Sequence, residues 1–482
     1  MRSPVAALWL LPALALGAQD ITAPHLEHTP AAVSVTLNGQ TFINQGLVGA
    51  GQLPAGTVDF LGDTLGSFSS LQVRSWRRVG GHYEGVLWTL PDRGRNDPAA
   101  GLFYDYSARL HRLRIRYTPQ DGHLSIVPDG GLRLRDFRGQ PFTGADPGQG
   151  SLVQRGLDLP SPASGPGAGK VSLDAEALQF ARDGGFYVGD EYAANVYRFD
   201  ARGRLQGVLQ PPAAITPRRD GHADFSSLAP PQTGRRNNQG VEGLSLSPDG
   251  SVLFVMLQSA LMQDSASGNA SGRINTRVLV YDLRHGSLPA APVEHYVVQL
   301  PAWRRSGDGG APDRTAAQSE IRALDNHRFL MLSRDSAGLG AADEGPVVYK
   351  SILLVDTRDA TNLAGSEYET GVQPVLQQPD ASTLRPQIRA AQWVEFINLL
   401  NPVQLARFGL GIGTLSEKWE AMDLVPALDP KAPDDYFLFV GNDNDFIARH
   451  CRMSGQSCDS AFDNDNRVLI YRVTLPHRAA GL

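Results

Sequence analysis

The chain has 482 residues, of which 41% are hydrophobic and 20% are charged, with 51 glycines and 33 prolines. So much glycine and proline favours frequent turns over long helices, which predicts an all-β architecture. The formal net charge of -6 and the lack of any Lys/Arg block exclude the basic face or arm of a nucleic-acid-binding protein.

The first twenty residues have the organisation of an export signal. Arg2 precedes an apolar run over residues 5–16, and small residues suited to cleavage follow at Gly17 and Ala18. We therefore expect a signal peptide over residues 1–18; the alternative is an uncleaved N-terminal anchor. Later apolar runs fall short of the roughly 18 residues that a membrane span needs. The mature chain is expected to be periplasmic or extracellular.

A three-part phrase then recurs along the chain. Each copy has an acidic residue at the start of an apolar strand, a second apolar strand that ends in polar residues, and a third with an aromatic residue and often an Asp. The copies cover residues 66–118, 174–203, 241–286, 319–357 and 419–473. The first copy is weaker, because it has Ser where the other four have Glu.

Repeated groups of short strands predict a β-propeller, in which blades arranged radially remove the long exposed edges of an open sheet. A pair of β-sandwiches is the alternative. We expect six blades in a single domain over residues 23–475, with residues 31–42 adding a strand to the last blade. The apolar spacing from Ile388 to Ile397, followed by Pro402, predicts a helical insertion over residues 380–410.

The inner strands of a propeller line one channel, so the repeated acids should converge near one mouth. They are Glu176, Glu242, Glu320 and Glu420. Four buried carboxylates repel one another and raise one another's pKa unless cations neutralise them. Calcium, which takes six to eight oxygen ligands, is the cation we expect there. The alternative is that each Glu only accepts backbone N–H groups at a strand end.

The ends of the second strands add further oxygen ligands and cations. The acidic and amide groups are Asp92, Asp190, Glu191, Asp335 and the run from Gly441 to Asp445. Arg93, Arg334 and Lys418 stand among them and could bind an anionic substrate. Adjacent strand residues point to opposite sides, so only one of Asp190 and Glu191 should face the channel.

Only two cysteines are present, Cys451 and Cys458. In an oxidising compartment they should form one local disulfide, and a zinc site is not expected from a single pair. The serine-hydrolase motif GxSxG is not found in the sequence, although a catalytic triad of other arrangement stays open.

Four phrases in order resemble the secreted bacterial phytase-like family, described as "esterase-like activity of phytase". They are DAEALQF with FYVGDEYAANVYRFDARGRL, NNQGVEGLSLSPDG, SEIRALDNHRFLMLSRD, and KWEAMDL with NDND. The resemblance covers residues 58–473 and implies a propeller with a calcium-dependent phosphohydrolase or esterase activity. The DAxDDPA run of alkaline phytase propellers survives only as Asp97-Pro98-Ala99, which puts phytate itself in doubt as the substrate.

We therefore expect metal-assisted hydrolysis of a small anionic ester at the channel mouth. The expected catalytic residues are Glu242, Arg334, Asp190 and Glu191. The expected substrate-binding residues are Arg93, Lys418 and Tyr192. The expected Ca²⁺ ligands are Glu176, Glu242, Glu320, Asp335, Glu420, Asn442 and Asp443. Two other functions stay open: a non-catalytic binding propeller with structural calcium, and a metal-dependent lactonase or carboxylesterase.

Overall fold

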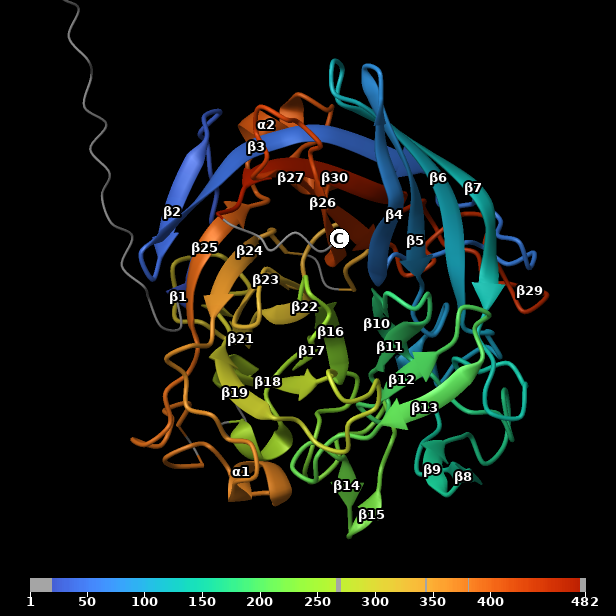
Figure 1. Ribbon diagram of the computed structural model, residues 1–482. Coiled ribbons are helices and arrows are strands. Elements are labelled where there is room, and N and C mark those ends of the chain that lie inside the picture. The colour runs from blue at the N-terminus through green and yellow to red at the C-terminus, as the bar shows by residue number, and fades with distance from the viewer. Residues whose placement is uncertain (1–19, 266–269, 343–344, 380, 477–482) are drawn as a thin grey trace, which may run out of the picture.

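Five blades stand radially around a central axis in the computed structural model, which describes residues 20–265, 270–342, 345–379 and 381–476 (Figure 1). Three blades are separate four-stranded sheets, and the other two are joined through their outermost strands into one nine-stranded sheet. The predicted signal peptide lies outside the described residues. The innermost strands are β4 (Ser70–Val79), β10 (Ala175–Phe180), β16 (Val241–Leu246), β22 (Ala317–Ala323) and β26 (Lys418–Pro426). Each contacts the next, and β26 contacts β4, so the ring closes as a β-propeller.

The outer strands follow the inner ones in antiparallel order. In the first three blades they are β5 (His82–Leu90), β6 (Arg109–Thr118), β7 (His123–Arg133), β11 (Phe186–Asp190), β12 (Val196–Phe199), β13 (Leu205–Leu209), β17 (Val252–Leu257), β18 (Asn275–Asp282) and β19 (Glu294–Gln299). In the last two they are β23 (Arg328–Arg334), β24 (Lys350–Asp356), β25 (Gln392–Asn398), β27 (Asp435–Asp443), β30 (Asn466–Thr474) and β3 (Gln40–Leu53).

The N-terminal segment closes the ring. Strand β3 pairs with β30 as the outermost strand of the last blade, and β2 (Val33–Leu37) folds back on β3 as a hairpin. This confirms that the N-terminal region adds a strand to the last blade, although most of that strand follows the predicted residues 31–42. The pairing joins the two ends of the described chain within one sheet.

Apolar cores fill the spaces between neighbouring blades. In β17, Leu253 and Val255 pack toward the second blade, whereas Phe254 and Met256 pack toward the fourth. Alternate residues of a strand point to opposite faces, so a strand covered on both faces reads as a continuous apolar run. Similar clusters lie between the other pairs of neighbouring blades, which explains why the phrases of the sequence were recognisable as strands.

Two predictions about the fold need correction. The described residues form five blades rather than six, one for each sequence phrase, and the long segments between phrases form loops and short hairpins. Within the predicted helical insertion, residues 392–398 form strand β25, and only α2 (Pro402–Ala406) is α-helical. A register shift in the pairing of β25 with β24 makes Phe396 an extra residue, which breaks the two-residue alternation and mimics helical spacing.

The remaining elements are short. The strands are β1 (Asp20–Ile21), β8 (Ser151–Gln154), β9 (Leu157–Pro160), β14 (Arg218–Arg219), β15 (His222–Ala223), β20 (Ala302–Trp303), β21 (Arg314–Thr315), β28 (Arg452–Met453) and β29 (Gln456–Ser457). The other helices are α1 (Glu367–Thr370) and four 3₁₀ turns, Pro98–Ala100, Met262–Asp264, Ala270–Gly272 and Ile412–Thr414.

The predicted disulfide between Cys451 and Cys458 is confirmed.

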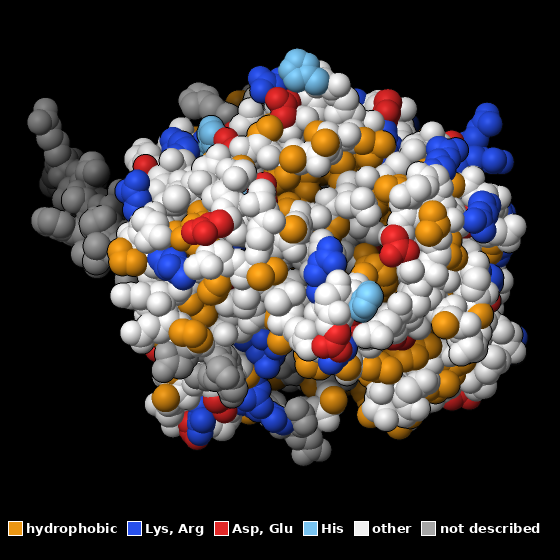
Figure 2. Space-filling model, turned by 90° about the horizontal axis from the view of Figure 1, so that it is seen from below, with side chains coloured by type: hydrophobic (Ala, Val, Ile, Leu, Met, Phe, Trp, Pro, Cys, Tyr) orange, Lys and Arg blue, Asp and Glu red, His pale blue; other side chains and the backbone are white. Residues whose placement is uncertain are grey.

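No helix among the described residues has the length and apolar character to cross a bilayer. On the face that Figure 2 shows, Lys and Arg side chains are interspersed with Asp and Glu.

Candidate active site

β-Bulges at the start of the inner strands build the site. In three of the inner strands, the residue left extra in the pairing with the second strand of the blade is a glutamate: Glu176 in β10, Glu242 in β16 and Glu420 in β26. A bulge leaves this residue out of the ladder and re-aims its side chain. All three glutamates line one cavity of about 300 Å³ at this mouth of the channel. The predicted convergence of these three acids is therefore observed.

The structure places the fourth predicted glutamate elsewhere. In β22 the extra residue is Ser319, so Glu320 is one position past the bulge. Its Oε2 accepts a hydrogen bond of 2.6 Å from Ser70 Oγ of β4, a strand that is not adjacent to β22 in the ring. Burial raises the pKa of Glu320 to about 8. Glu320 thus joins β22 to β4 and does not line the mouth cavity with the other three glutamates. Its role as a metal ligand stays a prediction.

Residues at the ends of the second strands complete the cavity wall. Glu191 and Gln258 line it one position after the last residues of β11 and β17, and Arg334 lines it as the last residue of β23. Glu191 is therefore the cavity-facing member of its acidic pair. Asp190 instead accepts hydrogen bonds from the backbone N–H groups of Asp174, Tyr192 and Ala193 at 2.8–3.2 Å, which fixes the turn after β11.

Two other predicted metal ligands, Asp335 and Asn442, form hydrogen bonds that hold neighbouring backbone segments in place. The carboxylate of Asp335 is occupied by Lys350 Nζ at 2.7 Å and by two backbone N–H groups, although the residue forms part of the cavity wall. Asn442 accepts from the backbone of Arg467 and donates to that of Asp465. These partners account for the polar atoms of both side chains, so their predicted role as metal ligands has no support in the geometry.

Two overlapping acidic groups lie beside the cavity. Oxygens of Asp92, Asp174 and Glu176 lie within 4.8 Å of one another, and so do those of Asp92, Asp443 and Asp445. Burial, reinforced by the charge of Asp174, raises the pKa of Asp92 to about 7. Burial also raises the pKa of Glu176 and of Asp443 well above the usual range. So many buried carboxylates need cations to remain charged together.

The donor set fits a hard cation. All donors in both groups are carboxylate oxygens, the ligands that calcium prefers. Two more buried acceptors, Glu191 Oε1 and Glu242 Oε2, have no hydrogen-bond partner among the described residues. The sequence prediction missed Asp174, which lies two residues before Glu176. Two acids at this short spacing were the sequence feature that could have identified Asp174 as a further metal ligand.

Cations of the chain already offset part of this charge. Arg93 Nη1 contacts Asp174 Oδ2 at 2.8 Å, and Lys418 Nζ lies 2.7 Å from Asp445 and 3.6 Å from Asp443. Arg334 forms a buried ion pair with Glu420 inside the cavity. Lys418 and Arg334 therefore line the cavity as predicted.

The other two predicted substrate-binding residues lie away from the cavity wall. Arg93 is buried against Asp174, and the Tyr192 hydroxyl donates to Gly144 O at 2.7 Å. Their interactions support the loops around the acidic groups, so direct contact with a substrate is not expected.

Three arginines at the mouth were missed by the sequence prediction. Arg273 and Arg314 line the cavity, and Arg236 is close enough to Arg273 for their charges to interact. Burial and then the charge of Arg273 lower the pKa of Arg236 to about 10; burial and Arg314 likewise lower that of Arg273. None of the three forms an ion pair with an acid of the described chain. A cationic group with no acid partner among the described residues, placed beside carboxylates, favours an anionic ligand.

The fold and the site define a β-propeller with a buried, acidic and arginine-rimmed pocket at one mouth. The chain belongs to the phytase-like family described as "Esterase-like activity of phytase", which matches residues 64–446. Membership suggests a secreted esterase-like hydrolase. An "Uncharacterized secreted protein" of the fungus Arthroderma benhamiae is 33% identical over 470 residues, covering 87% of this chain and 90% of the relative. The bacterial origin implied by the sequence resemblance stays a prediction.

Similar solved structures are distant. The N-terminal domain of Nup159 is 9% identical with a TM-score of 0.31, covering 95% of this chain and 100% of that one. The WD40 domain of Toxoplasma gondii coronin is 8% identical with a TM-score of 0.27, covering 96% and 90%. At these scores we draw no argument from them.

Proposed function

We propose that the chain is an exported, calcium-dependent hydrolase that cleaves phosphate esters or related esters in the mouth cavity. The observation that carries this proposal is that two acidic groups, which share Asp92 and reach the wall through Glu176, lie beside a cavity of about 300 Å³ with a cationic rim. Export is supported by the secreted relative and by the disulfide, and the periplasm or the exterior is the proposed compartment.

The residues that would hold calcium are the two acidic groups that share Asp92. They are Asp92, Asp174, Glu176, Asp443 and Asp445. When bound there, calcium would supply positive charge to polarise the ester and neutralise charge that develops on its oxygens. This assignment replaces the ring of repeat-start glutamates expected from the sequence.

The remaining cavity residues would bind and orient the substrate and move its protons. Arg273 and Arg314 would attract the anionic group, because neither forms an ion pair with an acid among the described residues. Burial, followed by the charge of Glu191, raises the pKa of Glu242 well above its usual range, and burial, followed by the charge of Asp174, raises the pKa of Glu191 to about 8. Such a pair can divide the roles, one carboxylate taking a proton from water while the protonated partner donates to the leaving oxygen.

Arg334 would act beside this pair. Its guanidinium is held by Glu420 and forms part of the cavity wall, where it can bind an oxygen of the substrate. Asp190 would position Glu191 through the turn that it caps, without touching the substrate.

Carboxylic-ester or lactone hydrolysis is the second candidate, because the family description names an esterase-like activity. Assays of a phosphomonoester, an aryl ester and a lactone, each with calcium and with excess chelator, separate the candidates. We expect calcium-dependent turnover of the phosphomonoester. Turnover of the aryl ester or lactone alone would replace the substrate class, and no turnover of any of them would favour a binding protein with structural calcium.

A further inference from the structure

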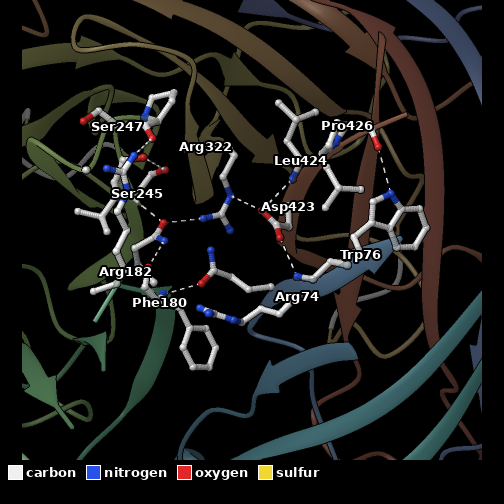
Figure 3. A pocket seen from close by; sticks show the side chains of 18 of the residues that line it. Arg74, Trp76, Phe180, Arg182, Ser245, Ser247, Arg322, Asp423, Leu424 and Pro426 are labelled. Atoms are coloured by element: carbon white, nitrogen blue, oxygen red, sulfur yellow. Dashed lines mark hydrogen bonds and ion pairs between the residues drawn. The ribbon is translucent and has the colours of Figure 1, made fainter. Parts of the chain in front are cut away.

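A second cavity lies at the opposite end of the channel. It has a volume of about 530 Å³ and is lined by the C-terminal parts of the inner strands, including Gln179–Phe180 of β10 and Asp423–Pro426 of β26. Arg322 of β22 lies between its walls (Figure 3). The proposed hydrolytic function uses none of these residues.

The charged side chains deep in this cavity form hydrogen bonds and an ion pair with other residues of the blades. Arg322 donates to Gln179 Oε1 at 3.0 Å and to the backbone oxygens of Met422 and Leu71. Asp423 accepts from the backbone N–H groups of Val73 and Leu424 at 2.7 and 2.8 Å, and lies 3.4 Å from Arg322. Arg322 and these two N–H groups thus offset the charge of the acid within the wall.

The rim is cationic. Arg74 is exposed, and its guanidinium carbon lies 4.7 Å from the centre of the Phe180 ring. Figure 3 shows the two side chains next to each other. It forms no ion pair within the described part of the chain. Arg182 lines the same cavity and donates to Pro248 O at 2.9 Å. A guanidinium that stacks on an aromatic ring keeps its N–H edge available for a carboxylate or a similar oxyanion.

A residue in a rare backbone conformation places Arg74 at this rim. The pairing of β4 with β5 shifts register between Arg74 and Arg77, and Ser75 between them has φ of 54°, in the left-handed region. Such a conformation is uncommon for a residue other than glycine and persists where the surroundings hold it. The bulge therefore builds the rim as a defined feature of the strand.

The apolar walls are also held in place. Trp76 stacks on Tyr83 with ring centroids 5.1 Å apart and an interplanar angle of 7°, and its indole Nε1 donates to Pro426 O at 3.0 Å. Phe180 is fixed at its backbone by Gln72 Oε1, which accepts from Phe180 N at 2.6 Å. Figure 3 shows Trp76 and Phe180 on different sides of the cavity. Walls that are ordered before binding lower the entropy cost of holding a ligand.

We propose that this cavity is a second ligand site, which binds a small organic anion with a flat apolar body, such as an aromatic carboxylate. The volume lies within the range of small-molecule sites, the aromatic walls suit a planar hydrocarbon, and Arg74 supplies the charge partner. Binding there needs neither calcium nor the mouth cavity.

Isothermal titration calorimetry with 2-naphthoate tests this proposal, with uncharged 2-naphthamide as the ligand control. Wild-type protein should bind naphthoate more tightly than naphthamide, and Arg74→Gln should weaken naphthoate about tenfold or more, because a charge-assisted hydrogen bond is lost. Arg114→Gln is the matched control: Arg114 is on β6 of the same blade, has a side chain 65% exposed and does not line this cavity. Its affinity should stay within twofold of wild type.

Equal affinities of wild type and Arg74→Gln would overturn the proposal, as would an equal loss in Arg114→Gln, which would indicate diffuse charge attraction. Failure of wild type to bind naphthoate at millimolar concentration would also overturn it. Phe180→Leu keeps an apolar side chain but removes the aromatic ring. It should lower the affinity for both naphthoate and naphthamide, because the naphthalene ring loses its stacking partner. Binding should persist in excess chelator, so the result does not depend on the proposed hydrolytic function.

Discussion

The folded state without calcium should lose stability as pH rises from about 5 to 8. Burial, followed by the charge of Asp174, raises the pKa of Asp92 to about 7 and that of Glu191 to about 8. In the unfolded chain both carboxyls titrate near pH 4. Between these values the folded state holds protons that the unfolded state has released, so raising the pH favours unfolding.

The slope follows from the number of retained protons. Each contributes about 1.4 kcal/mol per pH unit to the free energy of unfolding. Asp92 and Glu191 together give at most about 3 kcal/mol per pH unit between pH 5 and 7, and Glu191 alone about half of that between pH 7 and 8. Bound calcium would neutralise the carboxylates, so the stabilisation by calcium should grow with pH.

Urea unfolding followed by tryptophan fluorescence at pH 5, 6, 7 and 8, in excess chelator and in calcium, measures these slopes. Glu191→Gln should reduce the slope in chelator by about one proton, or about 1.4 kcal/mol per pH unit. Glu84→Gln is the control, because Arg77 and then His82 lower the pKa of this exposed carboxyl below the range tested. A stability in chelator that is constant or increases with pH would refute the reasoning, and so would equal protection by calcium at pH 5 and 8.

Three substitutions test other parts of the site. Arg334→Met should lower the free energy of unfolding by about 3 to 5 kcal/mol, because Glu420 is left buried without its cation. Adding Glu420→Gln to this variant should restore most of the lost stability, as measured by urea unfolding. If the double variant is no more stable than Arg334→Met, the ion pair is not the cause of the loss. Cys451→Ser should cost about 2 to 3 kcal/mol in the same assay and leave KM unchanged, since the disulfide is outside the cavity wall. Arg273→Gln should raise KM for an anionic ester about tenfold but not for a neutral one; equal effects on both would show that Arg273 does not recognise charge.

The fold was largely predictable because the blades repeat. Each of the five phrases places buried apolar residues on both faces of its strands, as in the run from Val252 to Leu257, and the structure forms one blade from each. Six blades were expected although only five phrases were found, and the described residues form one blade for each phrase. Strand β25 was mistaken for a helix because the bulge at Phe396 changes its spacing.

The sequence predicted which types of residue form the site, acidic residues with some cations, but not which individual side chains face the cavity. Glu320 matches the repeat in sequence, but the bulge in β22 falls on Ser319, and a shift of one residue turns a side chain to the other face of a strand. A pattern of apolar letters does not specify where a bulge falls. The same limit applies to Arg236, Arg273 and Arg314, which come from separate loops and short elements and meet only in the folded chain.

Phosphate release from a phosphomonoester, measured for wild type and Glu242→Gln in calcium and in excess chelator, tests the central claim most directly. The account predicts release by wild type only with calcium, and a loss of about 100-fold or more in Glu242→Gln, with a Tm close to that of wild type, because Gln keeps the shape of the buried side chain. Release that continues unchanged in chelator, or a Glu242→Gln variant as fast as wild type, would contradict it.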